Sequence, residues 1–117
     1  MLVALGEPTG EPRVVEAADG RRFAVFPIEG GFRVTDALCP HSRGPLAQGQ
    51  LHDNVLTCPR HGFRFDVDTG RCTTTRRYRL GVYRVLLREG RWYADVGEQL
   101  VVRSWTQWLR AYARGRT

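Results

Sequence analysis

The stretches CPHSRGPLAQG at residues 39–49 and CPRHGFRFDVDTG at residues 58–70 decide the fold of this chain, and they share one construction. The full pattern is Cys-x-His, sixteen residues, then Cys-x-x-His, so each stretch offers one thiolate and one imidazole. A proline follows each cysteine, where it fixes φ and removes a backbone donor. Each loop is therefore partly preorganised before any metal arrives.

The candidate metal ligands are Cys39, His41, Cys58 and His61. Four nitrogen and sulfur donors could form a tetrahedral zinc site, but structural zinc sites usually separate paired ligands by about two to five residues. A single residue separates Cys39 from His41. In a [2Fe-2S] cluster one iron can take both thiolates and the other both imidazoles, so the ligands need not converge on one point. The pattern therefore favours a two-iron cluster, with zinc or no metal as the alternatives.

The length of 117 residues fits one domain. The sequence has no run of eighteen apolar residues that could cross a membrane. Its first residues, MLVALGE, have neither a positive n-region nor an apolar stretch long enough for a secretion signal. We therefore expect a cytoplasmic protein with no membrane contact.

Positive charge gathers in the second half of the chain. Residues 1–57 hold five Arg and seven acidic residues, whereas residues 58–117 hold thirteen Arg and five acidic residues. The chain has no lysine, and arginine favours forked pairing with carboxylates or phosphates. We expect an acidic protein partner. Nucleic acid is the competing partner, but no recognition helix, zinc finger or aromatic RNA-binding signature accompanies the charge.

Short apolar runs with period-two alternation, separated by glycine-containing turns, predict an antiparallel all-β protein. The predicted strands are Arg13–Glu16, Arg22–Ile28, Phe32–Asp36, Val55–Thr57, Phe63–Asp66, Val82–Arg88 and Arg91–Val96. In the strand Val82–Arg88, the side chains of Tyr83, Val85 and Leu87 fall on one face, which we expect to face the core.

The tail after Val96 has helical rather than strand spacing. One face of the predicted helix carries Val101, Trp105, Trp108, Leu109 and Tyr112. The helix either packs on its own barrel or, because three arginines flank the aromatic stripe, forms a docking or oligomerisation element. We therefore predict a domain at residues 1–99, with cluster-binding loops at about 38–46 and 57–66, and a basic amphipathic helical extension at residues 100–117.

The two quoted stretches resemble the two cluster-binding boxes of Rieske ferredoxins, matching in ligands, glycines and the Phe-Asp-x-x-Thr-Gly tail together. The resemblance implies an antiparallel all-β sandwich or barrel with an inserted cluster-binding subdomain. It also implies that Cys39 and Cys58 hold the inner iron, and that His41 and His61 hold the outer, partly exposed iron. A carrier of this kind would pass single electrons from a flavoprotein reductase to a terminal oxygenase. The chain has no room for a catalytic domain, so it would be an electron carrier and not an enzyme, acting as a monomer or weak oligomer.

Departures from Rieske relatives refine this expectation. Rieske proteins of membrane complexes clamp the two loops with a disulfide, but the corresponding positions here are Gly44 and Arg60. Those relatives also have a serine where this chain has Phe63, so we expect fewer hydrogen bonds to the cluster and a potential near the low end of the Rieske range. The Pro-containing loop of many relatives is replaced by RCTTTRR at residues 71–77. We expect Cys72 to be a small buried residue and His52 to lie on the surface.

Three arginines beside the ligands, Arg43, Arg60 and Arg64, are expected to form either a docking face or a solvated rim. Two other functions remain open from the sequence. One is the small subunit of an assimilatory nitrite reductase, whose fold is similar. The other is a binding module in which the metal is only a structural staple without a redox role.

Overall fold

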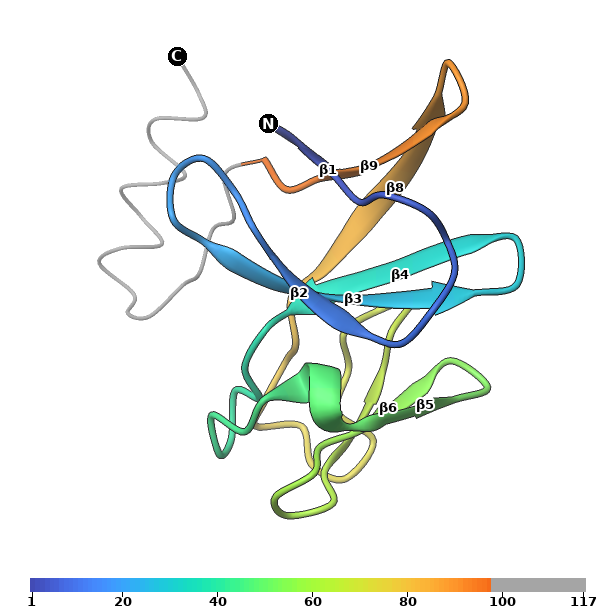
Figure 1. Ribbon diagram of the computed structural model, residues 1–117. Coiled ribbons are helices and arrows are strands. Elements are labelled where there is room, and N and C mark those ends of the chain that lie inside the picture. Colours follow the sequence, from blue (N-terminus) through green and yellow to red (C-terminus); the bar gives the residue numbers. More distant parts are fainter. Residues whose placement is uncertain (98–117) are drawn as a thin grey trace.

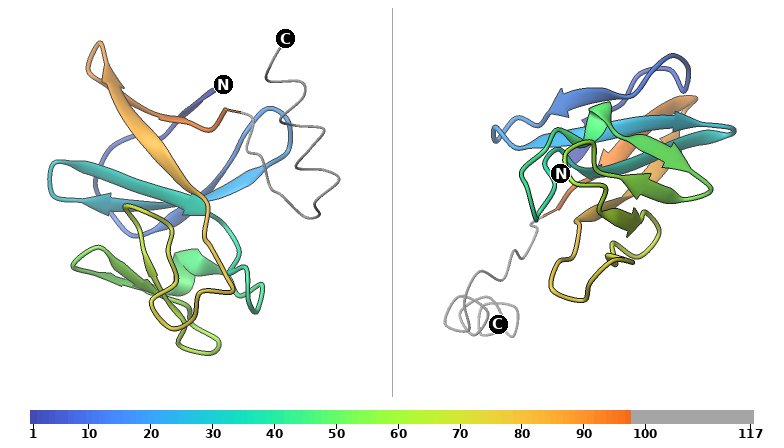
Figure 2. Two further views of the ribbon diagram at one scale, coloured as in Figure 1. Left: turned by 180° about the vertical axis from the view of Figure 1, so that it is seen from behind. Right: turned by 90° about the horizontal axis from the view of Figure 1, so that it is seen from below.

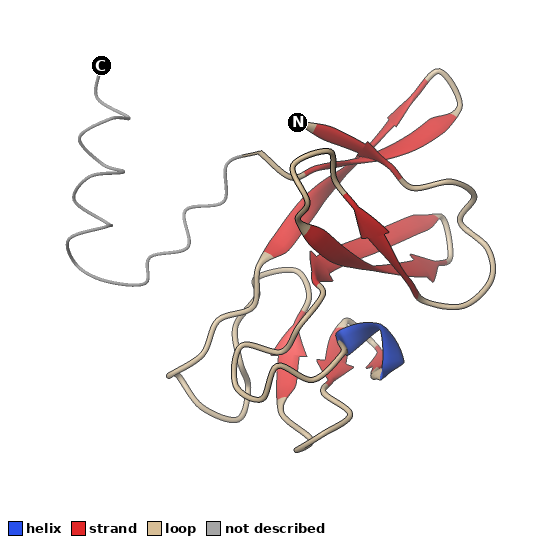
Figure 3. Cartoon of the chain, turned by 60° about the vertical axis from the view of Figure 1, so that its left-hand side comes forward, coloured by secondary structure: helices blue, strands red, loops and turns tan. Residues whose placement is uncertain are grey.

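The computed structural model describes residues 1–97, which form two antiparallel sheets (Figure 1). The larger sheet has the strand order β1-β9-β8-β4-β3-β2 and the smaller one the order β5-β6-β7. The strands of the larger sheet are β1 (Leu2–Ala4), β2 (Arg13–Glu16), β3 (Arg22–Ile28), β4 (Gly31–Asp36), β8 (Val82–Arg88) and β9 (Arg91–Asp95). Those of the smaller sheet are β5 (Gln50–His52), β6 (Val55–Thr57) and β7 (Arg64–Asp66). One turn of 3₁₀ helix, η1 (Leu46–Gln48), precedes β5 and is blue in Figure 3.

The all-β fold class predicted from the sequence is confirmed. The bounds of β2, β3, β6 and β8 agree with the prediction, and those of β4, β7 and β9 differ by one residue at one end. The prediction missed β1 and β5. Each has three residues, and unlike β6, which has the same length, neither directly precedes a ligand box.

Strand β3 separates two hydrophobic cores because successive side chains of a strand point to opposite faces. Phe23 and Val25 belong to the core enclosed by the curled larger sheet. Ala24 and Phe26 belong to a second core, which also contains the candidate ligands Cys39 and Cys58. The candidate metal centre is therefore built directly on the second face of a central strand.

Three loops gather at one end of the molecule, below the larger sheet in Figure 1 and again in the reverse view of Figure 2. They are the segments 37–45, 58–63 and 70–80, coloured from green to yellow. The turn between β8 and β9 lies at the opposite end in both views. The two sequence boxes are thus brought together at a single end of the fold.

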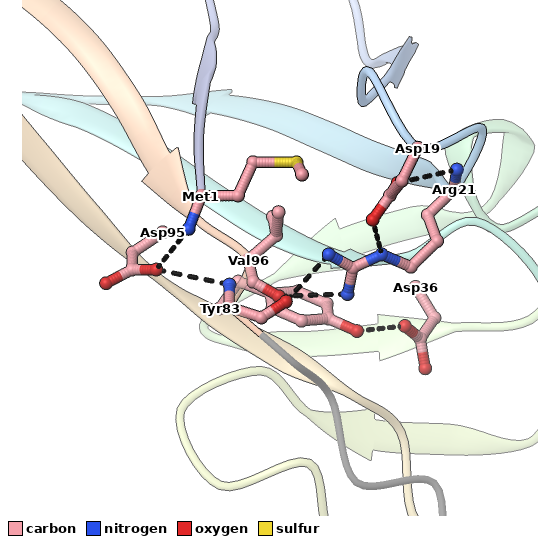
Figure 4. Close-up of polar contacts among 8 residues, drawn as sticks. Met1, Asp19, Arg21, Asp36, Tyr83, Asp95 and Val96 are labelled. Atoms are coloured by element: carbon pink, nitrogen blue, oxygen red, sulfur yellow. Dashed lines mark hydrogen bonds and ion pairs between the residues drawn. The ribbon is translucent and has the colours of Figure 1, made fainter.

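Polar contacts fix the end of β4, which leads into the first of these loops, and also the end of the described chain (Figure 4). At the end of β4, Asp36 accepts hydrogen bonds from the Tyr83 hydroxyl and from the Gly81 N–H. Burial, followed by the hydrogen bond to Asp36 and the charge of that carboxylate, raises the pKa of Tyr83 far above its ordinary value. Arg21 donates to the carbonyl oxygens of Val96 (3.0 Å) and Gly97 (2.7 Å), which holds the end of the described chain against the β2–β3 turn.

One prediction about β8 was wrong. Tyr83 and Val85 pack against the core as expected, but Leu87 is 56% exposed. Leu87 lies near the end of the β8–β9 hairpin, beyond the reach of the core. The predicted C-terminal helix and the extension at 100–117 lie outside the described residues. Within residues 1–97, no helix has the length and apolar character needed to cross a membrane.

Candidate metal centre

The two ligand loops have the same backbone hydrogen bonds. In each loop, the cysteine carbonyl accepts from the N–H four residues later, and the cysteine N–H donates to the carbonyl five residues later. The bonds are Arg43 N to Cys39 O (2.7 Å), Cys39 N to Gly44 O (2.9 Å), Gly62 N to Cys58 O (3.2 Å) and Cys58 N to Phe63 O (2.8 Å). Each cysteine is therefore fixed at the base of a closed loop that carries its histidine.

The two cysteines are buried side by side. Cys39 is fully buried and Cys58 is 2% exposed, and neither forms a disulfide. Burial raises the pKa of the Cys58 thiol. Hydrogen bonds outweigh this effect and leave the pKa below its ordinary value; they come from the Ser42 hydroxyl, the N–H groups of Arg60 and His61, and the Cys39 thiol. The thiolate is the form that binds metal, so these donors favour the ligand form of Cys58.

The two imidazoles also lie together, with ring centroids 5.4 Å apart. The His41 ring stacks on Phe63 at 3.9 Å and meets the Tyr78 ring at 5.1 Å, whereas His61 is exposed. The Nδ1 atom of His41 is buried without a hydrogen-bond partner. A buried polar atom of this kind calls for an explanation, and a bond to a metal ion would satisfy it.

The residues therefore fit a two-iron cluster. Thiol lies near thiol and imidazole near imidazole, as required if one iron takes two thiolates and the other two imidazoles. No three His, Cys, Asp or Glu side chains within residues 1–97 converge as ligands of a single ion. A cluster with two protein ligands on each iron does not need such convergence.

Side chains also join the two loops directly. The Ser42 hydroxyl oxygen lies 3.3 Å from Cys58 Sγ and accepts from Gly44 N–H at 3.3 Å, while Arg60 donates to the Ser42 carbonyl at 3.4 Å. A Cβ atom at Gly44 would come within 3.1 Å of both Cys58 Sγ and Arg60 Cγ. At positions 44 and 60, where the resemblance places the disulfide clamp of membrane-complex relatives, the two loops approach closely and polar contacts join them.

The remaining residues singled out from the sequence are placed as follows. Arg43, Arg60 and Arg64 are exposed, beside the ligands in sequence. Cys72 is buried in the core opposite Phe65 and His52 has an exposed side chain at the end of β5, so both expectations are confirmed.

The sequence analysis missed Ser42 and Tyr78. The position of Ser42 directly after a ligand could have marked it as a site residue, but its contact is with Cys58 on the other loop. Tyr78 is an isolated aromatic in an arginine-rich segment. Its ring closes over His41 and Phe63, so it covers the site from the segment that replaces the Pro-containing loop.

Comparison with known proteins gives one family and several relatives. A sequence profile of the Rieske [2Fe-2S] domain matches residues 5–84. The ferredoxin component of a naphthalene 1,2-dioxygenase system from Pseudomonas aeruginosa is 40% identical over 70 residues, or 59% of this chain and 66% of that protein. Ferredoxin CarAc from Metapseudomonas resinovorans is 34% identical over 89 residues, or 72% of this chain and 79% of that protein. The chain spans between about half and two thirds of the length of the naphthalene dioxygenase ferredoxins that it matches.

Solved structures have the same fold. A chain in the complex of reduced oxygenase and oxidised ferredoxin of carbazole 1,9a-dioxygenase superposes with a TM-score of 0.71 at 28% identity, covering 85% of this chain and 96% of that chain. A Mycobacterium tuberculosis protein described as the small subunit of an NADH-dependent nitrite reductase gives a TM-score of 0.72 at 22% identity, covering 83% of this chain and 96% of that chain. At that identity the second likeness shows the fold alone.

Proposed function

This chain belongs to the Rieske [2Fe-2S] domain family, and on that premise we propose that it carries single electrons from a reductase to the terminal oxygenase of a dioxygenase system. Cys39, His41, Cys58 and His61 would hold the cluster, which supplies one-electron redox chemistry when bound. The observation that carries this proposal is the side-by-side placement of two buried thiols and two imidazoles, with a buried and unpartnered Nδ1 on His41.

Exposed apolar residues and arginines adjoin the ligands in sequence, a composition found in protein interfaces. Leu38 is 43% exposed directly before Cys39, and the prolines that follow both ligand cysteines are exposed as well. The exposed Arg43 and Arg60 lie close to these apolar residues in sequence. An apolar centre with a polar, arginine-containing rim is typical of protein interfaces. This arrangement supports docking of a redox partner near His61, which would shorten the path for the electron.

The related proteins support this assignment of partners. Their names describe ferredoxin components of dioxygenase systems, and in the carbazole dioxygenase an oxygenase and a ferredoxin form a complex. The partners proposed for this chain are therefore a flavoprotein reductase and an oxygenase that present acidic surfaces. A cytoplasmic location remains a prediction from the sequence.

Metal analysis and spectroscopy of the purified protein test the proposal. We expect two irons and two inorganic sulfides per chain, and a rhombic EPR signal of low average g on reduction. The Cys58→Ala variant should lose the iron and sulfide as well as the EPR signal. The Cys72→Ala variant is the matched control, because Cys72 is buried in the same core but faces Phe65. Colourless protein with one zinc per chain would refute the proposal and identify a structural staple.

The division of the chain also remains a proposal. Residues 1–99 would form the cluster-binding domain and residues 100–117 a helical extension. A chain that ends at residue 99 should then keep the visible absorption spectrum and the EPR signal of the full chain. Loss of the cluster on truncation would mean that the extension is part of the domain.

A further inference from the structure

The segment 71–79 carries an unusual concentration of positive charge beside the candidate metal centre. It contains four arginines and no acidic residue. Arg71, Arg76 and Arg79 line an open recess of about 510 Å³ together with Cys72 and Tyr78, and we call it the arginine recess. This volume lies within the roughly 300–1,000 Å³ typical of small-ligand sites. The recess therefore has room for a side chain of another molecule.

The charges of the recess are not neutralised by the described part of the chain. Within residues 1–97, no ion pair involves Arg71 or Arg76. The acidic residues nearest in sequence are engaged elsewhere: Asp66 accepts from the N–H groups of Asp68 and Thr69, and Asp68 pairs with Arg33. A bound anion would remove the mutual repulsion of these arginines.

The backbone places two of these arginines face to face. Arg71 and Arg79 are partners in an isolated antiparallel bridge. Like charges in directly opposite positions are destabilising. The Arg79 guanidinium is further anchored by its hydrogen bond to the Thr69 carbonyl at 3.2 Å. The bridge fixes the backbone positions of both arginines, and the bond to Thr69 holds the Arg79 guanidinium, so the positive charge of the recess is partly preorganised for an anion.

The base of this segment is rigid. Leu80 N–H donates to Gly70 O at 2.8 Å, and a Cβ atom at Gly70 would lie only 2.1 Å from Leu80 O. On the other arm, Thr73 N–H donates to Arg64 O at 2.8 Å, which attaches the segment to β7. The recess therefore needs little ordering when a ligand binds, and this reduces the entropic cost of binding.

Tyr78 connects the recess to the candidate metal centre. It lines the recess, and its ring lies 5.1 Å from the ring of His41. A group bound in the recess would thus be separated from a proposed ligand by a single aromatic ring. The recess lies on the covered side of the centre, because His41 is the half-buried histidine and His61 the exposed one.

We propose that the arginine recess receives a carboxylate side chain of the acidic redox partner, so that the docking surface extends from the exposed ligand loop onto segment 71–79. This inference rests on the proposed electron-carrier function. Arginine forks match carboxylates in a bidentate geometry. A single nucleic-acid strand would instead require exposed aromatic rings for stacking, whereas the Tyr78 ring packs against His41 and Phe63.

The absence of lysine from the sequence allows a site-specific test. Arg76→Lys keeps the charge and introduces the only side-chain amine of the chain. Arg91→Lys is the matched control, because Arg91 is an exposed arginine at the β8–β9 turn, at the opposite end of the molecule. The probe is pentaglutamate with a blocked amino terminus. A water-soluble carbodiimide converts its carboxyl group to an O-acylisourea, the amine attacks the acyl carbon, an amide forms and the urea leaves.

Mass spectrometry of the cluster-loaded variants measures the coupling yield, with the N-terminal amine as the internal reference. We expect about ten-fold more coupling for Arg76→Lys than for Arg91→Lys, because the recess raises the local concentration of acidic groups. The excess should disappear when Arg71→Gln is added. It should persist when Arg84→Gln is added, because Arg84 does not line the recess.

Equal coupling of the two variants, or coupling that ignores Arg71→Gln, would overturn the proposal. Stronger competition by oligothymidylate than by unlabelled pentaglutamate would also overturn it and assign the recess to phosphate groups. The visible spectrum distinguishes failure of the recess proposal from failure of the electron-carrier proposal. An intact cluster with equal coupling refutes the recess alone, whereas protein without a cluster refutes the electron-carrier function.

Discussion

The Ser42 hydroxyl provides the sharpest test of how the two ligand loops cooperate. Its oxygen lies 3.3 Å from Cys58 Sγ and accepts from Gly44 N–H at 3.3 Å. Because Gly44 N–H donates to the oxygen, the hydroxyl hydrogen is free to point at the sulfur. A ligand thiolate has no hydrogen to donate, so the hydroxyl is the donor in this contact. Ser42→Ala removes this donor and the acceptor of Gly44 N–H, whereas the backbone hydrogen bonds of both loops remain.

The expected effect is a lower reduction potential. The reduced cluster carries one more negative charge than the oxidised cluster, so it gains more from a donor to its ligand sulfur. A hydrogen bond to a charged group contributes about 1.5–3 kcal/mol. If about one third of this differs between the two redox states, the potential falls by roughly 20–40 mV, because a one-electron couple moves about 59 mV for each tenfold change in the equilibrium constant.

Voltammetry of the parent protein, Ser42→Ala and Ser42→Thr measures this shift, and EPR verifies that each variant holds an intact cluster. Ser42→Thr keeps the hydroxyl and should stay near the parent potential. An unchanged potential in Ser42→Ala would refute the reasoning. So would an equal fall in both variants, since it would trace the effect to packing and not to the hydrogen bond.

Two further predictions concern stability. Gly70 has φ +79° and a Cβ position 2.1 Å from Leu80 O, so Gly70→Ala should lower the free energy of unfolding by more than the roughly 1–3 kcal/mol of backbone strain alone. Gly90→Ala, with φ +76° and no atom within 4 Å, is the control in thermal unfolding, and equal losses would contradict the close-approach argument. The raised pKa of Tyr83 means that its stabilising contribution is complete below about pH 10 and is lost as the pH rises further. Denaturant unfolding between about pH 8 and 11 should show a shallower loss in Tyr83→Phe, because the bond to Asp36 is already absent; parallel slopes would refute this.

Local patterns carried most of the fold prediction. Alternation over β3 and β8 extends across seven residues each, which is long enough to define both bounds. The three residues of β1 give no such pattern, and their placement depends on pairing with β9, far along the chain. Alternation also could not show where the core ends, and this is why Leu87 was assigned to the wrong environment.

In the candidate site too, features encoded in consecutive residues could be predicted, whereas contacts between distant residues could not. The ligand loops could be recognised because each is encoded in a few consecutive residues. The contact of Ser42 with Cys58 crosses between loops, and the stacking of Phe63 on His41 joins residues more than twenty positions apart. Phe63 was considered only as the absence of a donor. In the structure it orients a proposed ligand, while a hydroxyl from the other loop contacts the ligand sulfur.

The unequal cover over the two histidines has a kinetic consequence. Phe63 and Tyr78 cover the His41 ring, whereas His61 is exposed, so the shortest electron path to the proposed partners would start at His61. A carrier with a single site for electron transfer cannot bind its electron donor and its electron acceptor at the same time. The carrier proposed above would have to release its reductase before binding its oxygenase, so turnover would follow a shuttle cycle in which the two partners compete for one surface. An excess of either partner would then slow electron transfer from reductase to oxygenase. Fast turnover would require that each complex be weak.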